Sequence, residues 1–99
     1  MMGYTLFLDD ERHPVDETNI VVRSFEEAVE YVRANGTPKH VCFDHDLGGL
    51  RNGYHFALWL TDWHMDGNGF PESYSVHSQN PVGADNIRGV MDEYMKWIS

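Results

Sequence analysis

The stretch His40-Val-Cys-Phe-Asp-His-Asp-Leu-Gly-Gly, residues 40–49, decides the fold that we expect. A short apolar run ends in two carboxylates and an imidazole, and glycines follow. This order is typical of a buried strand whose last residues reach the edge of a sheet. Two other short strand-like runs are also followed by polar residues, in residues 4–12 and in residues 74–81. Because parallel strands bring their carboxyl ends to one edge, the three stretches predict a parallel sheet with one site there.

Strand-like and helix-like segments alternate along the rest of the chain. Short β-type runs at residues 4–8, 20–23, 41–44 and 73–77 predict strands. Helical periodicity predicts helices over residues 25–35, 54–64 and from 81 onward. Ser24 to Glu27 fits a capping box, and Asn80 followed by Pro81 is typical of a helix start. The connection from Asp9 to Thr18 has no helical periodicity, so we expect a loop there.

This alternation predicts an α/β fold with right-handed crossovers. We expect a single domain over residues 1–99, with two or three layers and a parallel sheet of about four strands. Because the first connection lacks a helix, one face of the sheet should be thinly covered. Trp59, Trp63 or Trp97 would be available there to pair with a second copy, which leaves a homodimer open.

Composition restricts the classes of partner. The formal net charge of −9 argues against duplex DNA and against a membrane surface. No apolar run is long enough to span a membrane, and the N-terminus lacks the features of a signal peptide, so we expect a cytoplasmic protein. The single Cys42 lies in an apolar run and is interpreted as a buried, reduced thiol. A small phosphate ligand remains compatible with the acidic charge, because a bound divalent cation can reverse the local sign.

Carboxylates at two strand ends predict a metal site. Asp9 and Asp10 follow the first strand, and Asp44 and Asp46 follow the central one. Clustered carboxylates repel one another unless a cation lies between them, and oxygen ligands suit Mg²⁺, or Mn²⁺ in its place. The alternatives are structural: one aspartate of the first pair caps the following turn, or Asp46 bonds the backbone of the glycine turn that follows it.

The late strand ends at the start of a helix, where free N–H groups and the helix dipole suit an anion. His77 has a reference pKa near 6.5 and could transfer a proton as a general acid or base. Ser78 and Asn80 offer polar contacts to a phosphate. The alternative is an Asn-capped helix in which His77 simply satisfies a neighbouring group.

Two further side chains are candidate phosphate contacts. Arg12 follows the first acidic pair and could clamp a phosphate, or form an ion pair with Asp10 or Glu11 that holds the loop. His45 is either a phosphate donor or a loop residue that faces solvent. No His-Glu-x-x-His or paired-cysteine motif is present, so the sequence argues against a zinc site.

The positions of Asp9-Asp10, Asp44 and Ser78 resemble those of a response-regulator receiver domain. In receivers the acidic pair binds Mg²⁺, the central aspartate is phosphorylated, and the Ser or Thr contacts the phosphoryl group. The chain departs from that pattern because receivers have a helix after the first strand and a lysine after a fifth strand. Its only lysines, Lys39 and Lys96, do not end a late strand.

The chain more closely resembles the cyclic-phosphate-processing receiver-like domains. These form a divergent, shortened group of receivers from bacteria and phages. The matching motifs are Leu6-Phe-Leu-Asp-Asp-Glu-Arg12 with Pro14, Phe43-Asp-His-Asp-Leu-Gly48, Gly53-Tyr54, and Val76-His-Ser-x-Asn-Pro-x-Gly83 with Asn86. The resemblance implies a truncated receiver topology of flavodoxin-like type. It also implies an activity on cyclic phosphates.

These observations together predict a metal-dependent phosphoesterase or phosphate-transfer enzyme. The substrate would be a cyclic phosphate on a small nucleotide or on an RNA end. Asp44 would act either as a metal ligand or as a covalent nucleophile, with His77 as general acid or base. Two alternatives stay open: a non-catalytic binder of a phosphorylated nucleotide signal, and a phosphoacceptor receiver in which Asp44 is modified.

Overall fold

The computed structural model describes residues 3–14 and 16–99. Its elements in chain order are β1 (Thr5–Leu8), β2 (Ile20–Val22), α1 (Phe25–Asn35), β3 (His40–Phe43), α2 (Gly53–Met65), β4 (Ser73–Val76) and α3 (Pro81–Ile98). Every strand and helix expected from the sequence is present, and the boundaries differ by about one residue. The described residues of the predicted loop after β1 contain no helix; Val15, within that loop, lies outside the described residues.

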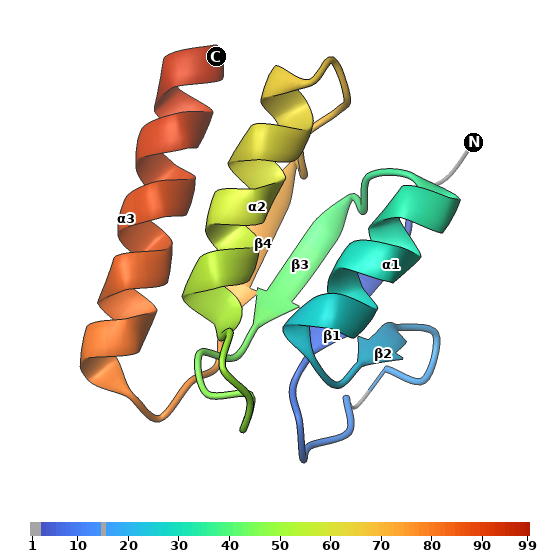
Figure 1. The fold of residues 1–99 in the computed structure, drawn as a ribbon, viewed down its shortest axis with the longest axis vertical. Helices are drawn as coiled ribbons and strands as arrows, with labels where there is room; N and C mark the ends of the chain where they lie inside the picture. Colours follow the sequence, from blue (N-terminus) through green and yellow to red (C-terminus); the bar gives the residue numbers. More distant parts are fainter. Residues whose placement is uncertain (1–2, 15) are drawn as a thin grey trace.

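The four strands form one sheet in the order β2-β1-β3-β4, and every pairing is parallel. Figure 1 shows α1, α2 and α3 side by side in front of this sheet. Helix α2 lies between the other two and contacts both of them. The fold is therefore α/β with two layers, consistent with a truncated receiver of flavodoxin-like topology. In the described part of the chain, the second face of the sheet carries no helix, as the missing first helix predicts.

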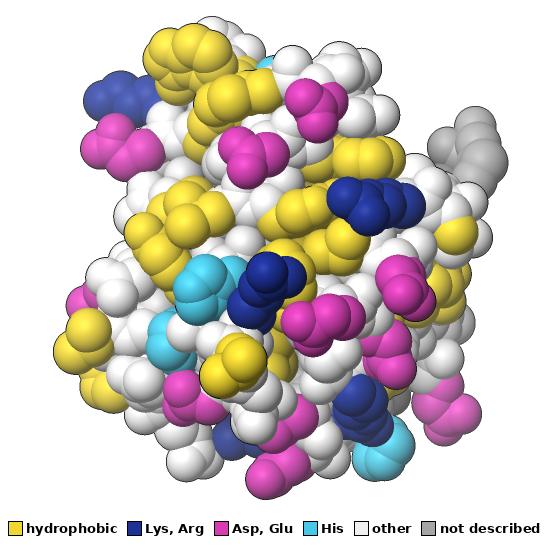
Figure 2. Space-filling view, viewed as in Figure 1, with side chains coloured by type: hydrophobic (Ala, Val, Ile, Leu, Met, Phe, Trp, Pro, Cys, Tyr) yellow, Lys and Arg dark blue, Asp and Glu magenta, His cyan; other side chains and the backbone are white. Residues whose placement is uncertain are grey.

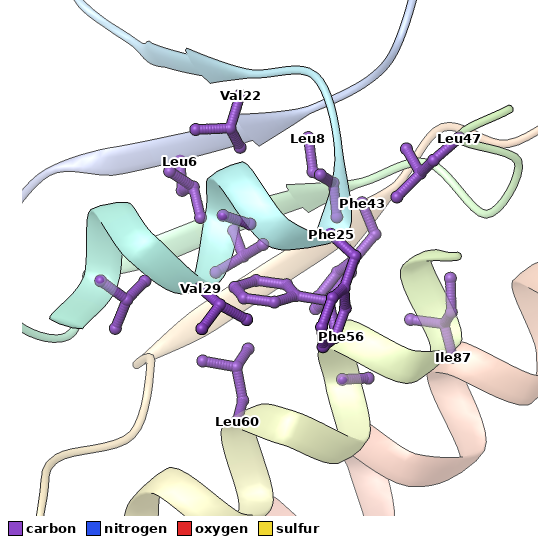
Figure 3. Close-up of a cluster of buried hydrophobic side chains, with 14 of the residues drawn as sticks. Leu6, Leu8, Val22, Phe25, Val29, Phe43, Leu47, Phe56, Leu60 and Ile87 are labelled. Carbon is purple, nitrogen blue, oxygen red and sulfur yellow. The ribbon is translucent and has the colours of Figure 1, made fainter. Parts of the chain in front are cut away.

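The core lies between the sheet and the three helices (Figure 3). Alternate strand residues point into it, so Leu6, Leu8, Val41 and Phe43 are fully buried. Phe56 of α2 meets them from the helix layer, with its ring 6.1 Å from that of Phe43. This packing fixes the position of the strand ends, because a shift of one residue would move each apolar side chain to the wrong face.

The intervening strand residues face away from the helices. Phe7, Val21, Cys42 and Ser75 are register partners in one row across this second face. Cys42 is only half-buried, so the prediction of a buried thiol is wrong. The reason is the alternation of the strand: Val41 and Phe43 take the core positions on either side of Cys42.

The predicted helix starts are present, with one difference in detail. The Ser24 side chain accepts a hydrogen bond from the Glu27 N–H, and the Asn80 side chain accepts one from the Gly83 N–H. The Glu27 carboxylate, however, accepts from the N–H of Arg23 and not from that of Ser24. Arg23 is thereby joined to the first turn of α1.

The surface agrees with the acidic composition. Figure 2 shows acidic side chains spread over the helix-covered face, with fewer basic ones among them. Within the described residues, no helix combines the length and the apolar character that crossing a membrane requires.

Candidate active site at the carboxyl edge of the sheet

Three polar residues stand directly after the strands and are fixed there by the backbone. The N–H of Asp9 donates to the carbonyl of Val22 (3.1 Å), that of Asp44 to Leu8 (3.0 Å), and that of His77 to Phe43 (2.9 Å). These bonds extend the parallel ladders by one residue. Asp9, Asp44 and His77 are therefore held at one edge of the sheet, where the sequence predicted a site.

The side chains of these residues converge. A carboxylate oxygen of Asp9, one of Asp44 and a ring nitrogen of His77 all lie within 4.8 Å of one another. Nε2 of His77 is 3.0 Å from Oδ2 of Asp9. Asp9 is 1% exposed, whereas the His77 side chain is 24% exposed. The cluster is therefore buried at Asp9 and accessible to solvent at His77.

The two carboxylates have opposite electrostatic environments. Burial alone would raise the pKa of Asp9, but backbone N–H donors from Arg12 and Glu11, together with His77, hold its pKa below the usual value. Burial and then the negative charge of Asp9 raise the pKa of Asp44, despite smaller opposing effects from His77 and nearby backbone N–H groups. Asp44 is thus the carboxylate whose charge lacks sufficient compensation.

The imidazole of His77 is also fixed by stacking. Its ring lies parallel to that of Phe7, with centroids 4.9 Å apart and an interplanar angle of 7°. Phe7 precedes Asp9 by two residues and belongs to the face of the sheet that carries no helix. His77 is therefore restrained by its backbone, by Phe7 and by Asp9.

A cavity of about 200 Å³ opens beside the cluster. It is lined by Asp9, Asp10, Glu11, Arg12, Asp44, Asp46 and Gln79. Asp10 and Asp46 thus line the same cavity but do not belong to the converging donor group. The Asp46 side chain is 68% exposed and is engaged by His45 at 2.8 Å. Of the four predicted metal ligands, the structure brings Asp9 and Asp44 together.

The predicted phosphate contacts lie around this cavity and differ in the hydrogen bonds that they already make within the protein. Arg12 lines it, and its Nη1 donates to the carbonyl of His77 at 3.2 Å; no ion pair joins it to Asp10 or Glu11 in the described residues. The Asn80 side chain is used in capping α3. The Ser78 hydroxyl accepts from the N–H of Asn80 at 3.1 Å, which still leaves its own O–H able to donate.

His45 packs against the first turn of α3. A Cβ at Gly83 would lie 2.3 Å from the His45 ring, so only glycine permits this approach. Gly53 meets a similar restriction at the start of α2, where a Cβ would lie 2.0 Å from the carbonyl oxygen of Asp44. These two glycines bring both helix starts against the segment that carries Asp44.

The chain is similar to known proteins in sequence and in fold. A family model described as the cyclic-phosphate processing receiver domain matches residues 4–93. The chain belongs to this family. The resemblance seen in the sequence motifs is thereby confirmed, and the domain is a receiver associated with cyclic-phosphate processing.

A solved structure supports the fold of this receiver. It is described as the yeast Spc42 trimeric coiled coil, amino acids 181–211, fused to another structure. The two chains are 19% identical, with a TM-score of 0.58 over 89% of this chain and 63% of that one. At this identity the similarity concerns the fold alone. No curated protein matches the chain significantly.

Neither lysine of this receiver domain lies at the acidic edge. The backbone of Lys39 bonds Tyr4 and Glu72 at the opposite edge of the sheet, before β3 begins. Lys96 lies in the last turn of α3, whereas the site is at the first turn. The lysine that receivers have after a fifth strand therefore has no counterpart at this edge among the described residues.

Sequence reasoning missed Arg23. Its Nη1 donates to the carbonyl oxygens of Asp9 (3.0 Å) and Arg12 (2.6 Å), and its Nη2 lies 3.2 Å from Nδ1 of His13. Arg23 therefore fixes the acidic loop after β1. The available signal was a cation placed at the end of an adjacent parallel strand, which brings it to the same edge.

Proposed function

We propose that this receiver domain hydrolyses or transfers a cyclic phosphate in the cavity at the carboxyl edge of its sheet, with the help of a divalent cation. The convergence of Asp9, Asp44 and His77 within 4.8 Å is the observation that carries the proposal. The family supports the link to cyclic phosphates. The cation and the type of reaction are our inference from the residues.

The charge of the cavity supports the need for a cation. Five of its seven lining residues are acidic, and Arg12 is the one cation among them. A phosphate is an anion and would be repelled by such a surface unless a cation intervened. A cation at the cluster would also compensate the charge of Asp44, whose pKa is raised by burial and by Asp9.

The residues present fit a divalent ion. Asp9 and Asp44 would hold it through carboxylate oxygens, in a position that their backbone hydrogen bonds already fix. When bound, such an ion supplies a Lewis acid that polarises a phosphoryl oxygen or lowers the pKa of a water molecule. Arg12 would contact the phosphate from the cavity wall, with the Ser78 hydroxyl and the start of α3 nearby.

His77 is the titratable nitrogen beside these carboxylates. Because ionised Asp9 can only accept, the Nε2 atom of His77 carries the proton in their hydrogen bond. Two roles follow for this ring at the site: proton transfer, with Asp9 holding the orientation, or coordination of the cation. Either role requires the fixed geometry that Phe7 and Asp9 provide.

The size of the cavity restricts the substrate. About 200 Å³ is less than the roughly 300–1,000 Å³ typical of sites that enclose a whole drug-sized ligand. It suits a phosphate and part of a sugar, with the base outside. The net charge of −9 opposes binding along a polynucleotide. A small cyclic nucleotide or a cyclic phosphate at an RNA end fits both properties.

Phosphorus NMR tests the proposal. Cyclic nucleotides and oligonucleotides with a 2′,3′-cyclic phosphate end would be incubated with the protein, with divalent ions and with a chelator. We expect new phosphomonoester or phosphodiester signals that disappear with the chelator and in the Asp44→Asn variant. Asp85→Asn, which changes an exposed carboxylate on α3, is the matched control and should behave as wild type.

The same experiment distinguishes the two alternatives. Signals that shift or broaden without conversion would replace the enzyme with a non-catalytic binder. If no ligand causes a change, labelling of Asp44 by a small phosphodonor would instead favour a phosphoacceptor. The absence of a lysine at the site argues against that last function.

A further inference from the structure

We propose that His77 is a nitrogen ligand of the cation and that the site therefore selects a transition-metal ion such as Mn²⁺ or Co²⁺ over Mg²⁺. The inference rests on the proposed function for the presence of a cation. It goes beyond that function by assigning the third ligand and the chemical class of the ion. It also replaces the expectation of a site made of oxygen ligands alone.

The distance between the donor atoms supports this assignment. Nε2 of His77 and Oδ2 of Asp9 are 3.0 Å apart. Two ligands about 2.1 Å from one ion, at right angles to each other, are separated by about 3.0 Å. When the ring carries its proton on Nδ1 instead of Nε2, the hydrogen bond between these atoms can therefore be exchanged for two bonds to an ion with little movement of either side chain. A carboxylate oxygen of Asp44 completes the group within 4.8 Å.

The oxygen donors alone do not distinguish the ion, because Mg²⁺ is commonly held by one or two carboxylates with water as its other ligands. Asp10 and Asp46 line the cavity but are absent from the converging group, so two carboxylates remain. Mg²⁺ favours oxygen ligands and near-ideal octahedral geometry, whereas imidazole nitrogen suits divalent transition-metal ions, whose affinity for such a site rises from Mn²⁺ through Co²⁺ to Ni²⁺. An imidazole fixed against two carboxylates is a donor set that matches the second group of ions.

The restraints on His77 also suit a ligand. Its ring is stacked on Phe7. Its backbone N–H donates to the carbonyl of Phe43, and its backbone carbonyl accepts from the guanidinium of Arg12. A ring held by its surroundings loses little conformational freedom when it coordinates an ion. Contacts of this kind, behind the ligands of a metal, are known to contribute to the affinity for the ion.

His77 differs from the other histidines in its partner. The remaining imidazoles are bonded elsewhere: His13 to Arg23, His40 to Ser73 and Ser75, His45 to exposed Asp46, His55 to the Asn52 N–H, and His64 to Tyr94. Within residues 3–14 and 16–99, His77 alone joins two carboxylates in a converging group. This leaves a single nitrogen donor to test.

Pulsed electron paramagnetic resonance of bound Mn²⁺ tests the inference without reference to turnover. A directly coordinated imidazole produces a ¹⁴N coupling on the Mn²⁺ signal. We expect this coupling in the wild type and in a His40→Gln control, and its loss in His77→Gln, whose amide can still donate to Asp9. Calorimetry should show Mn²⁺ bound at least about tenfold more tightly than Mg²⁺. His77→Gln should remove most of that preference while changing the Mg²⁺ affinity little.

The outcomes separate this inference from the proposed function. Equal affinities for Mn²⁺ and Mg²⁺, or a ¹⁴N coupling that persists in His77→Gln, would overturn the ligand assignment and leave a metal-dependent reaction intact. Failure of every divalent ion to bind would overturn the cation and the ligand assignment together. Absence of the ¹⁴N coupling from the wild-type spectrum would also overturn the ligand assignment, whether or not His77→Gln folds.

Discussion

The loops after β1 and β3 each place an aspartate at the same edge of the sheet, but they treat its charge differently. Asp9 is 1% exposed, and it accepts hydrogen bonds from two backbone N–H groups and from His77. Asp44 accepts no hydrogen bond from a side chain in the described ranges, and its pKa is raised by burial and by Asp9. The charge of Asp9 is therefore compensated within the fold, whereas the proposed function assigns the compensation of Asp44 to a bound cation.

The comparison implies that Asp9 contributes to the stability of the fold, whereas Asp44 lowers the stability and contributes to function. A carboxylate with several donors contributes to the folded state, and its removal leaves those donors without an acceptor. A carboxylate held near a like charge costs stability, which is a common property of functional sites. Substitutions at the two loops can test this difference, and the largest effect is expected at Asp44.

Replacement of Asp44 by Asn should reduce turnover of a cyclic phosphate by roughly 100-fold or more, because one of two charged cation ligands is lost. The far-ultraviolet circular dichroism of the variant should match that of the wild type. Initial rates measured by phosphorus NMR, at saturating divalent ion, would test the effect, with Asp85→Asn as control. A rate within a few-fold of wild type would mean that Asp44 is not part of the reaction.

Replacement of Asp9 by Ala should lower the free energy of unfolding by about 2–4 kcal/mol, measured with urea in the presence of a chelator. The reason is that the N–H groups of Glu11 and Arg12 and the Nε2 of His77 lose their acceptor. Asp44→Ala should leave the stability unchanged or increase it under the same conditions. Equal losses in the two variants would remove the distinction between the carboxylates.

Local sequence signals were sufficient to predict the fold. Each strand was marked by a short β-type run and each helix by periodic apolar positions, and two of the helices were also marked by a capping residue, Ser24 or Asn80. Such signals depend on neighbours within a few residues, so a single sequence contains them. The alternation of elements and the missing helix after β1 predicted a thinly covered face but left open whether the fold has two layers or three.

The site was predictable only in part. The strand ends indicated that Asp9, Asp44 and His77 would share one edge, and they do. Selecting among the carboxylates required the register of the strands: Asp9 follows Phe7 by two residues and Asp44 follows Cys42 by two, so the alternation favours this pair over Asp10. The stacking of Phe7 on His77 spans 70 residues of sequence, and no local pattern marks it.

Replacement of Arg23 by Gln should loosen the loop after β1 and leave the loop after β3 unchanged. Loss of the guanidinium removes donors to the carbonyls of Asp9 and Arg12, which should cost about 1–2 kcal/mol of unfolding free energy. Hydrogen exchange should become faster at residues 10–13 and remain unchanged at 44–46. Arg23→Lys, with a single charged group, should recover part of the protection. Uniform acceleration in both loops would show that Arg23 supports the fold generally.

The smallest effect is a difference in how the two carboxylates respond to pH. The lowered pKa of Asp9 contributes stability that is complete above its unfolded value of about 3.9 and is lost as the pH falls through the folded value. The raised pKa of Asp44 has the opposite effect on stability. The ionised form of Asp44 costs stability near neutral pH, and this cost disappears as the pH falls toward 4.

In urea titrations with chelator, any stability advantage of Asp44→Asn over wild type should therefore shrink between pH 7 and 4. The deficit of Asp9→Asn should persist to pH 4 and decrease only below it. Parallel curves for the two variants would mean that both aspartates titrate alike, and the separation of stability from function between them would not hold.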